Sequence, residues 1–237
     1  MNPIKKFSPE DAAYFERRNR FTEKYSDAGF SFIADNWPMM AGTVNIARSL
    51  AIYDLVKRVS DLPGHFCELG CWNGTNLIYL AKLAQLTKPR SYTEVFGFDA
   101  FAGLQVFDEK DGGAVQAGRG KYKGNPELLR DALKWHGLED TVRVVEGNIE
   151  QSLPAFLEER KDVRFSFVYL DTDLYPSIRC GIELLYPKLL KGGIMAFDEY
   201  NLEDWPGETS AVHDVLGEDV VIHAVPMTRQ PTAYIVK

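Results

Sequence analysis

The sequence has no long apolar run, and this absence excludes a membrane-spanning helix, which needs about 20 such residues. It also has no surplus of basic residues, since its formal net charge is −7 at pH 7. We therefore expect no nucleic-acid partner and no membrane partner. The first stretch, MNPIKKFSPEDAAYF, contains no apolar signal core, so we expect a cytoplasmic protein.

Cysteine is also scarce, and the three residues are Cys67, Cys71 and Cys180. Cys67 and Cys71 have no second cysteine pair that would complete a zinc site. We expect three reduced thiols, as is usual in the cytoplasm. The remaining composition, 45% hydrophobic and 26% charged over 237 residues, is typical of a globular chain long enough for one α/β domain.

Two short apolar runs, residues 165–170 and 194–197, enclose a single helical pattern at residues 177–190. A Lys191-Gly192-Gly193 turn is expected to end this helix. The pattern is a strand–helix–strand unit, and such a crossover makes its two strands parallel.

Each of these runs ends in acids, the first in Asp171 and Asp173 and the second in Asp198 and Glu199. Neighbouring strands lie about 5 Å apart, so Asp171, Asp198 and Glu199 would converge at the carboxyl edge of the sheet. Converging carboxylates repel one another unless a positive group lies between them, and a hard divalent cation is the simplest such group. Solvated strand ends or helix caps are the structural alternative.

The rest of the chain alternates between strand and helix patterns. Ser8-Pro9-Glu10 opens a helix through residues 12–25, and an amphipathic helix spans residues 43–60. The glycine- and charge-rich stretch 104–125 is a long loop, either functional or disordered. Further strands are expected at 65–69, 95–99, 142–146, 220–225 and 233–236, and further helices at 75–86, 127–136, 154–160 and 209–216. The last two strands are too close for a crossover helix, so they form an antiparallel hairpin.

The loop after the first strand reads Glu68-Leu69-Gly70-Cys71-Trp72-Asn73-Gly74. A dinucleotide fingerprint would read G-x-G-x-x-G, but here the middle glycine is absent and Trp72 stands near its place, which disfavours a pyrophosphate. A ligand without phosphate, such as S-adenosylmethionine, needs no such approach. We expect the cofactor-binding residues of this loop to be Glu68, Gly70, Trp72, Gly74 and Thr75.

Two later strand ends supply further candidate contacts to the cofactor. Asp99 ends the second strand, where a carboxylate accepts hydrogen bonds from both ribose hydroxyls. Asn148 and Ile149 follow the third strand, where an amide pairs with the adenine amine and an aliphatic side chain packs on the ring. The structural alternative for Asp99 is a helix or turn cap.

These motifs together resemble class I S-adenosylmethionine-dependent methyltransferases, and the macrocin O-methyltransferase family most closely. The matching stretches are FCELGCWNGTN, GFDAFAGL, VYLDTDLYPS, ELLYPKLLKGG and FDEYNLEDWPGE, from about residue 66 to 210. The resemblance implies a Rossmann-like α/β fold, with a mostly parallel seven-stranded sheet and a C-terminal antiparallel hairpin. Residues 1–60 would be an N-terminal helical lid or oligomerisation segment, with a homodimer as the expected assembly, and residues 61–237 the methyltransferase domain.

The resemblance also implies Mg²⁺ bound by Asp171, Asp198 and Glu199. The family often has Asp where this chain has Glu199, and it has an acid where this chain has Asn148. Members methylate sugar hydroxyls, so we expect a small hydroxylated substrate such as a glycoside. A bound Mg²⁺ would orient two neighbouring hydroxyls and acidify the one that reacts, with Asp171 as metal ligand, cofactor neighbour and proton acceptor.

Other interpretations remain open at this point. A catechol-type phenol would satisfy the same geometry as a sugar diol. His213, in the short helix after the acids, is a second candidate catalytic residue. A nicotinamide-dependent oxidoreductase is disfavoured by the missing glycine and the terminal hairpin. A non-catalytic binding protein is disfavoured by the glycine loop, Asp99 and both acid pairs.

Overall fold

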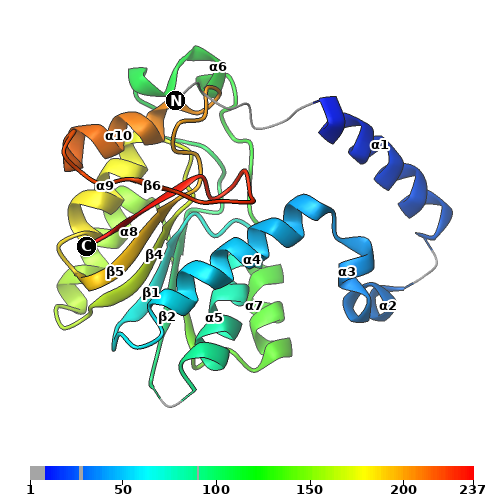
Figure 1. Ribbon diagram of the computed structural model, residues 1–237, viewed down its shortest axis with the longest axis horizontal. Helices are drawn as coiled ribbons and strands as arrows, with labels where there is room; N and C mark the ends of the chain where they lie inside the picture. The colour runs from blue at the N-terminus through cyan, green and yellow to red at the C-terminus, as the bar shows by residue number, and fades with distance from the viewer. Residues whose placement is uncertain (1–8, 27–28, 90) are drawn as a thin grey trace.

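A single seven-stranded sheet is the centre of the protein, and the computed structural model describes residues 9–26, 29–89 and 91–237 (Figure 1). The strand order is β3-β2-β1-β4-β5-β7-β6. Strands β1 to β5 run parallel, whereas β7 is antiparallel to β5 and β6, so the predicted Rossmann-like α/β fold is confirmed. The strands are β1 His65–Leu69, β2 Val95–Asp99, β3 Val142–Glu146, β4 Phe165–Leu170, β5 Leu189–Phe197, β6 His223–Ala224 and β7 Ala233–Val236.

Helices cover both faces of this sheet, which explains why its central strands are apolar throughout rather than alternating. Every residue of β4 is buried. One face carries α4 Thr43–Arg58, α5 Thr75–Thr87 and α7 Pro126–His136, which share one apolar cluster. The opposite face carries α8 Ile149–Glu159, α9 Tyr175–Leu185 and α10 Pro206–Leu216, which share a second (Figure 1).

Three helices at the N-terminal side form an arm beside this three-layer body (Figure 1). They are α1 Pro9–Lys24, α2 Phe30–Asp35 and α3 Trp37–Met40. Neither α2 nor α3 buries any residue, whereas α4 contributes Ala51, Ile52 and Leu55 to the core. The arm that stands apart is therefore shorter than the predicted segment 1–60. Its role as a lid or dimerisation element stays a prediction, and Ser8, the predicted start of α1, lies outside the described residues.

The structure corrects the predicted end of the helix between β4 and β5. Helix α9 ends at Leu185 instead of residue 190, because the proline at position 187 has no backbone N–H to continue the helical hydrogen bonds. Lys191-Gly192-Gly193 is not a helix-ending turn but part of β5. There the backbone N–H of Gly192 donates to the carbonyl of Lys237 at 2.7 Å, which extends the pairing of β5 with the end of the chain.

Smaller differences affect the element boundaries. Helix α8 begins at Ile149, so Pro154 lies inside it rather than at its start. Helix α10 begins at Pro206, and β6 is shorter than the predicted strand 220–225. Among the helices of the described residues, none has the length and apolarity that crossing a membrane requires.

Candidate active site

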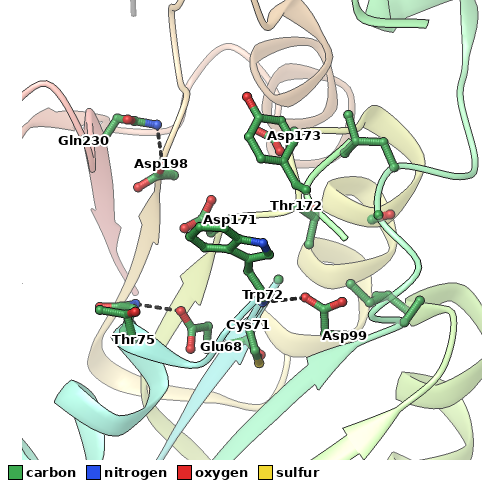
Figure 2. Close-up of a pocket in the computed structure, with 18 of the residues that line it drawn as sticks. Glu68, Cys71, Trp72, Thr75, Asp99, Asp171, Thr172, Asp173, Asp198 and Gln230 are labelled. Carbon is green, nitrogen blue, oxygen red and sulfur yellow. Dashed lines mark hydrogen bonds between the residues drawn. The ribbon is translucent and has the colours of Figure 1, made fainter. Parts of the chain in front are cut away.

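A cavity of about 910 Å³ opens at the carboxyl edge of the parallel strands. The loops after β1, β2 and β4, the end of β5 and helices α4 and α5 all contribute to its lining. Figure 2 shows acids from four strand ends around this cavity, namely Glu68, Asp99, Asp171 and Asp198. The carboxyl edge of an open α/β sheet is where ligands bind, so this cavity is the candidate active site.

The two glycines of the first loop are required by the fold itself. Gly70 has φ +90°, and a Cβ there would lie 1.8 Å from the carbonyl oxygen of Asp171. Gly74 has φ +82° as the residue before α5, and a Cβ there would lie 2.1 Å from Cδ1 of Leu129. Gly70 and the neighbouring Trp72 and Thr75 line the cavity, whereas Gly74 is not among the described lining residues. Gly74 therefore shapes the loop that the cofactor would contact.

Asp99 is fixed in place at the end of β2. Its Oδ2 accepts a hydrogen bond from the backbone N–H of Trp72 at 2.7 Å (Figure 2). Its Oδ1 accepts one from the backbone N–H of Phe101 at 2.6 Å. Burial raises the pKa of this carboxyl above its ordinary value, although these backbone bonds oppose the shift. Each oxygen retains a further lone pair, so Asp99 can cap the loop and still accept hydrogen bonds from a ligand.

Glu68 is almost fully buried at the end of β1. Its Oε1 accepts a hydrogen bond from Nδ2 of Asn76 at 2.8 Å, while its Oε2 has no hydrogen-bond partner among the described residues. Burial raises the pKa of Glu68 well above its ordinary value. A buried carboxylate oxygen without a partner beside a cavity is ready to accept a hydrogen bond from a bound ligand.

Asn148 and Ile149 also line the cavity, as the sequence predicts for the adenine end of the cofactor. Asn148 precedes α8, but its side chain makes no capping hydrogen bond to the helix. Ile149 is 7% exposed and packs in the core on the α8 face. The Asn148 amide is therefore not engaged in capping the helix.

Carboxylates from β4 and β5 meet where the sequence expects them to. Asp171, Asp173 and Glu199 offer oxygen atoms that all lie within 4.8 Å of one another. This all-oxygen donor set fits a hard divalent cation such as Mg²⁺. Asp173, which the sequence places at the strand end without assigning it as a ligand, belongs to this group.

Asp198 lies beside that group and is held by protein donors on several sides. The hydroxyl of Tyr169 donates to its Oδ1. Nε2 of Gln230 donates to its Oδ2 at 2.5 Å (Figure 2). The same nitrogen donates to Oε1 of Glu199 at 2.6 Å. The sequence analysis missed Gln230, because nothing in the loop PMTRQPT marks one polar residue as facing the acids.

Arg48 of α4 is the most important residue that the sequence analysis missed. Its Nη2 lies 2.8 Å from Oδ2 of Asp171, and its Nη1 lies 3.0 Å from Oδ1 of Asp198. Burial disfavours the charged guanidinium, but the surrounding acids outweigh this and raise the pKa of Arg48 above its ordinary value. One signal could have found it, since Arg48 stands four residues before buried Ile52, on the apolar face of an amphipathic helix.

Helix α10 carries a buried acid beside this group and the histidine that the sequence predicts as catalytic. Glu208 of α10 is fully buried, and its Oε1 accepts a hydrogen bond from the backbone N–H of Glu199 at 2.8 Å. His213 of the same helix is not among the described residues that line the cavity. Its Nε2 lies 3.0 Å from the hydroxyl of Tyr200, and its Nδ1 lies 3.4 Å from Oε1 of Glu218. The structure therefore does not bring His213 to the carboxylates.

The loop 104–125 forms part of the cavity wall through Leu104, Gln105, Val106 and Tyr122. It contains a 3₁₀ turn, η2 Glu109–Asp111, and a short helix, α6 Gly113–Gln116. Backbone hydrogen bonds close the loop on itself, from Leu104 to the carbonyl of Lys121 and from Gly120 to that of Leu104. The loop is therefore ordered and lines the cavity, which disagrees with the disordered alternative; a functional role for it stays a prediction.

Comparison with known proteins agrees with this geometry. The sequence model of the macrocin-O-methyltransferase (TylF) family matches residues 9–224. A tetracenomycin rhamnosyl 4′-O-methyltransferase of Streptomyces olivaceus is 27% identical over 201 residues, which cover 81% of this chain and 74% of the relative. The demethyldecarbamoylnovobiocin O-methyltransferase of Streptomyces niveus is also 27% identical over 201 residues, covering 79% and 74% respectively.

A solved structure is similar over nearly the whole length of both chains. The crystal structure of CalS11, a calicheamicin methyltransferase, superposes with a TM-score of 0.87 at 27% identity, covering 97% of this chain and 93% of that one. The family match runs from α1 to β6 and includes every cavity acid described above. This O-methyltransferase therefore belongs to the macrocin-O-methyltransferase (TylF) family.

Proposed function

We propose that this protein transfers the methyl group of S-adenosylmethionine to a sugar hydroxyl of a small glycoside, with Mg²⁺ at the carboxylates. The observation that carries the proposal is a single cavity lined by Asp99 and Asn148 as well as by Asp171, Asp173 and Asp198. Its volume of about 910 Å³ suits a cofactor and an acceptor together. The names of two relatives support a sugar acceptor. One is the tetracenomycin rhamnosyl 4′-O-methyltransferase, and the other is CalS11, a TDP-rhamnose 3′-O-methyltransferase.

The residues of the first two strand ends would hold the cofactor. Asp99 would accept hydrogen bonds from the ribose hydroxyls, and Glu68 would offer its second oxygen to a donor of the cofactor. Asn148 would bond to the adenine, with Ile149 packed on the ring. Trp72 and Thr75, with the backbone of Gly70, would form the wall beside the methionine portion. The acidic lining also suits the positive sulfonium centre of S-adenosylmethionine.

Carboxylates of the next two strand ends would hold Mg²⁺ and the acceptor. The proposed ligands are Asp171, Asp198 and Glu199. Asp171 and Glu199 belong with Asp173 to the group of close oxygen donors, and Asp198 is linked to that group through Gln230. When bound, Mg²⁺ supplies Lewis acidity that makes a coordinated hydroxyl easier to deprotonate. Asp171 would receive the hydroxyl proton as the oxygen–methyl bond forms and the methyl–sulfur bond breaks, leaving neutral S-adenosylhomocysteine. Fixed positions of both reactants would supply much of the remaining rate.

Binding and transfer can be tested separately on the full chain. Calorimetric titration with S-adenosylmethionine and then with Mg²⁺ should show both ligands binding to the wild type, with Mg²⁺ binding lost in Asp198→Ala. Asp162→Ala is the matched control, because this acid is 72% exposed and pairs with Arg160. Absence of cofactor binding in the wild type would overturn the whole proposal.

The acceptor class requires a transfer assay with labelled S-adenosylmethionine. We expect methyl incorporation into rhamnosides with a free vicinal diol and none into catechols. Incorporation into catechols alone would replace the sugar by a phenol. Equal transfer to a monodeoxy glycoside that keeps the reacting hydroxyl but lacks its neighbour would remove the argument for chelation of two hydroxyls.

A further inference from the structure

Arg48 differs from the other cation of the cavity in what it contacts. The basic side chains described as lining the cavity are Arg48 and Lys82. Nζ of Lys82 lies 3.2 Å from Nε2 of His136. The guanidinium of Arg48 instead joins Asp171 to Asp198, and it lies 5.7 Å from the centre of the Tyr169 ring. Arg48 thus neutralises acids of the candidate metal site.

Two of the three proposed metal ligands, Asp171 and Asp198, are also partners of Arg48. Asp171 belongs to the group of oxygen donors within 4.8 Å of one another, and its Oδ2 is also the atom nearest to Nη2 of Arg48. A divalent ion and a guanidinium that share one carboxylate repel each other at this short range. Binding of an ion to Asp171 therefore favours withdrawal of the guanidinium from that carboxylate.

The two acids bound by Arg48 differ in burial. Asp198 also accepts hydrogen bonds from Tyr169 and Gln230, and its side chain is 1% exposed. The side chain of Asp171 is 23% exposed and faces the cavity. Arg48 can therefore release Asp171 into the cavity while it keeps its bond to Asp198.

We propose that Arg48 is an internal counter-cation that competes with the divalent ion for Asp171 and so lowers the affinity of the site for that ion. The inference rests on the proposed function only in assuming that these carboxylates take a divalent ion. Arg48 is a positioning residue in this account, because it acts through Asp171 and Asp198. Without an ion it prevents mutual repulsion of the acids. With an ion it gives up Asp171 and stays bonded to Oδ1 of Asp198, whose other lone pairs can still face the ion.

The test compares ion affinity in Arg48→Met with that of the wild type, by calorimetric titration with Mg²⁺ alone and by Mn²⁺ relaxation of water protons. Methionine retains much of the aliphatic volume and removes the charge. We expect affinity to rise about tenfold or more, because the competing charge is gone. Arg58→Met is the matched control on the same helix, since Arg58 bonds to Tyr234 and Asp54, and its affinity should equal that of the wild type.

A second readout separates competition from a general structural role. Without an ion, Arg48→Met should melt at a lower temperature than the wild type, because its acids are no longer neutralised. With saturating Mg²⁺ that difference should shrink, since the ion takes over the neutralisation. If Arg48→Met does not fold, Arg48→Lys provides the same comparison, with a smaller expected gain in affinity because lysine retains the charge but lacks the planar fork.

Two outcomes would overturn the inference, and they are distinguishable. Unchanged or weaker ion affinity in folded Arg48→Met would overturn the inference alone and leave the proposed function intact. Absence of ion binding in every variant, with S-adenosylmethionine still bound, would overturn it together with the metal part of the proposed function. Ion binding by Arg48→Met but not by the wild type would support the competition in its strongest form.

Discussion

At the scale of single residues, Asp99 links the shape of the cofactor loop to the charge of the cavity. Its carboxylate accepts hydrogen bonds from the backbone N–H groups of Trp72 and Phe101, and burial raises its pKa. A raised carboxyl pKa means that folding favours the protonated form. Its contribution to stability is therefore present below the ordinary carboxyl pKa and is lost as pH rises through the folded value.

The affinity for the cofactor should depend on the pH in the opposite direction from the stability contribution of Asp99. Ribose hydroxyls donate to the ionised carboxylate, so affinity should be full above the raised pKa and fall as pH drops through it. Asp99→Asn should lower affinity for S-adenosylmethionine about tenfold to a hundredfold and remove this dependence on Asp99. Calorimetry across the acid range measures both effects. Glu146→Gln is the control, because Glu146 pairs in register with Asp99 on β3 but bonds to Arg130 outside the cavity.

Gly70 allows the loop after β1, on the cofactor side of the cavity, to pack directly against the backbone of Asp171 on the metal side. In Gly70→Ala the new methyl group would meet the carbonyl of Asp171, and the backbone would also keep an unfavourable positive φ. We expect a loss of about 2–4 kcal/mol in the free energy of unfolding, measured with urea. Gly137→Ala is the control, with φ +62° but nothing within 4 Å of the added atom, and it should cost about 1 kcal/mol. Equal losses in the two variants would contradict the proposed close approach.

At the scale of elements, the loop 104–125 is held in place by one buried acid. Oδ1 of Asp111 accepts a hydrogen bond from the backbone N–H of Tyr175, in the first turn of α9, at 2.6 Å. Its Oδ2 accepts one from Asp108 at 2.7 Å. This residue, 1% exposed, therefore anchors the cavity wall to the helix that follows Asp171 and Asp173.

Asp111→Ala should release that wall, because it leaves both backbone donors without their partner. We expect faster amide hydrogen exchange within 104–125 and a higher KM for cofactor or acceptor, with a stability loss of about 1–3 kcal/mol. Glu109→Ala changes an exposed acid of the same 3₁₀ turn and should leave exchange and KM near those of the wild type. Unchanged exchange in Asp111→Ala would show that the wall is held by other contacts.

The elements also show what sequence patterns could and could not predict. The carboxyl ends of β1 to β5 were predictable because each strand has β-branched or aromatic residues before a glycine, an acid or a turn. The end of α9 was missed because leucines beyond Pro187 continue the helical spacing. The proline has no backbone N–H, so the helical hydrogen bonds stop there. The short helix α6 follows no apolar period, since local hydrogen bonds stabilise it rather than a buried stripe.

The same contrast holds for the site. Asp171 and Glu199 were predictable because parallel strands bring their ends together whatever the loops do. Arg48 lies 123 positions before Asp171, and only the packing of α4 on the sheet brings them into contact. Sequence reasoning foresaw that a positive group must lie between the acids, but it assigned that role to a metal ion alone.

At the scale of the whole molecule, the cofactor class decides how ligands change the stability of the chain. The dinucleotide alternative depends on a glycine where Trp72 stands, and this residue has φ 47° and is 49% exposed beside the cavity. Its indole Nε1 also donates to the carbonyl of Lys123 at 3.3 Å, which links it to the loop 104–125. A pyrophosphate would therefore have to displace both the side chain and its loop contact.

Thermal unfolding with each cofactor tests this argument on the whole chain. A ligand that binds only the folded state, at a hundred times its Kd, stabilises by about 2.7 kcal/mol. For a chain of this length, S-adenosylmethionine should then raise Tm by about 5–10 °C. NAD or NADH at the same concentration should leave Tm unchanged, because the cavity offers no glycine-lined approach for the pyrophosphate. Trp72→Gly removes the obstruction but leaves Asp99 in place, so it tests whether this one residue excludes NAD. A rise in Tm with NAD in Trp72→Gly but not in the wild type would support this role of Trp72. A rise of similar size in the wild type would contradict it.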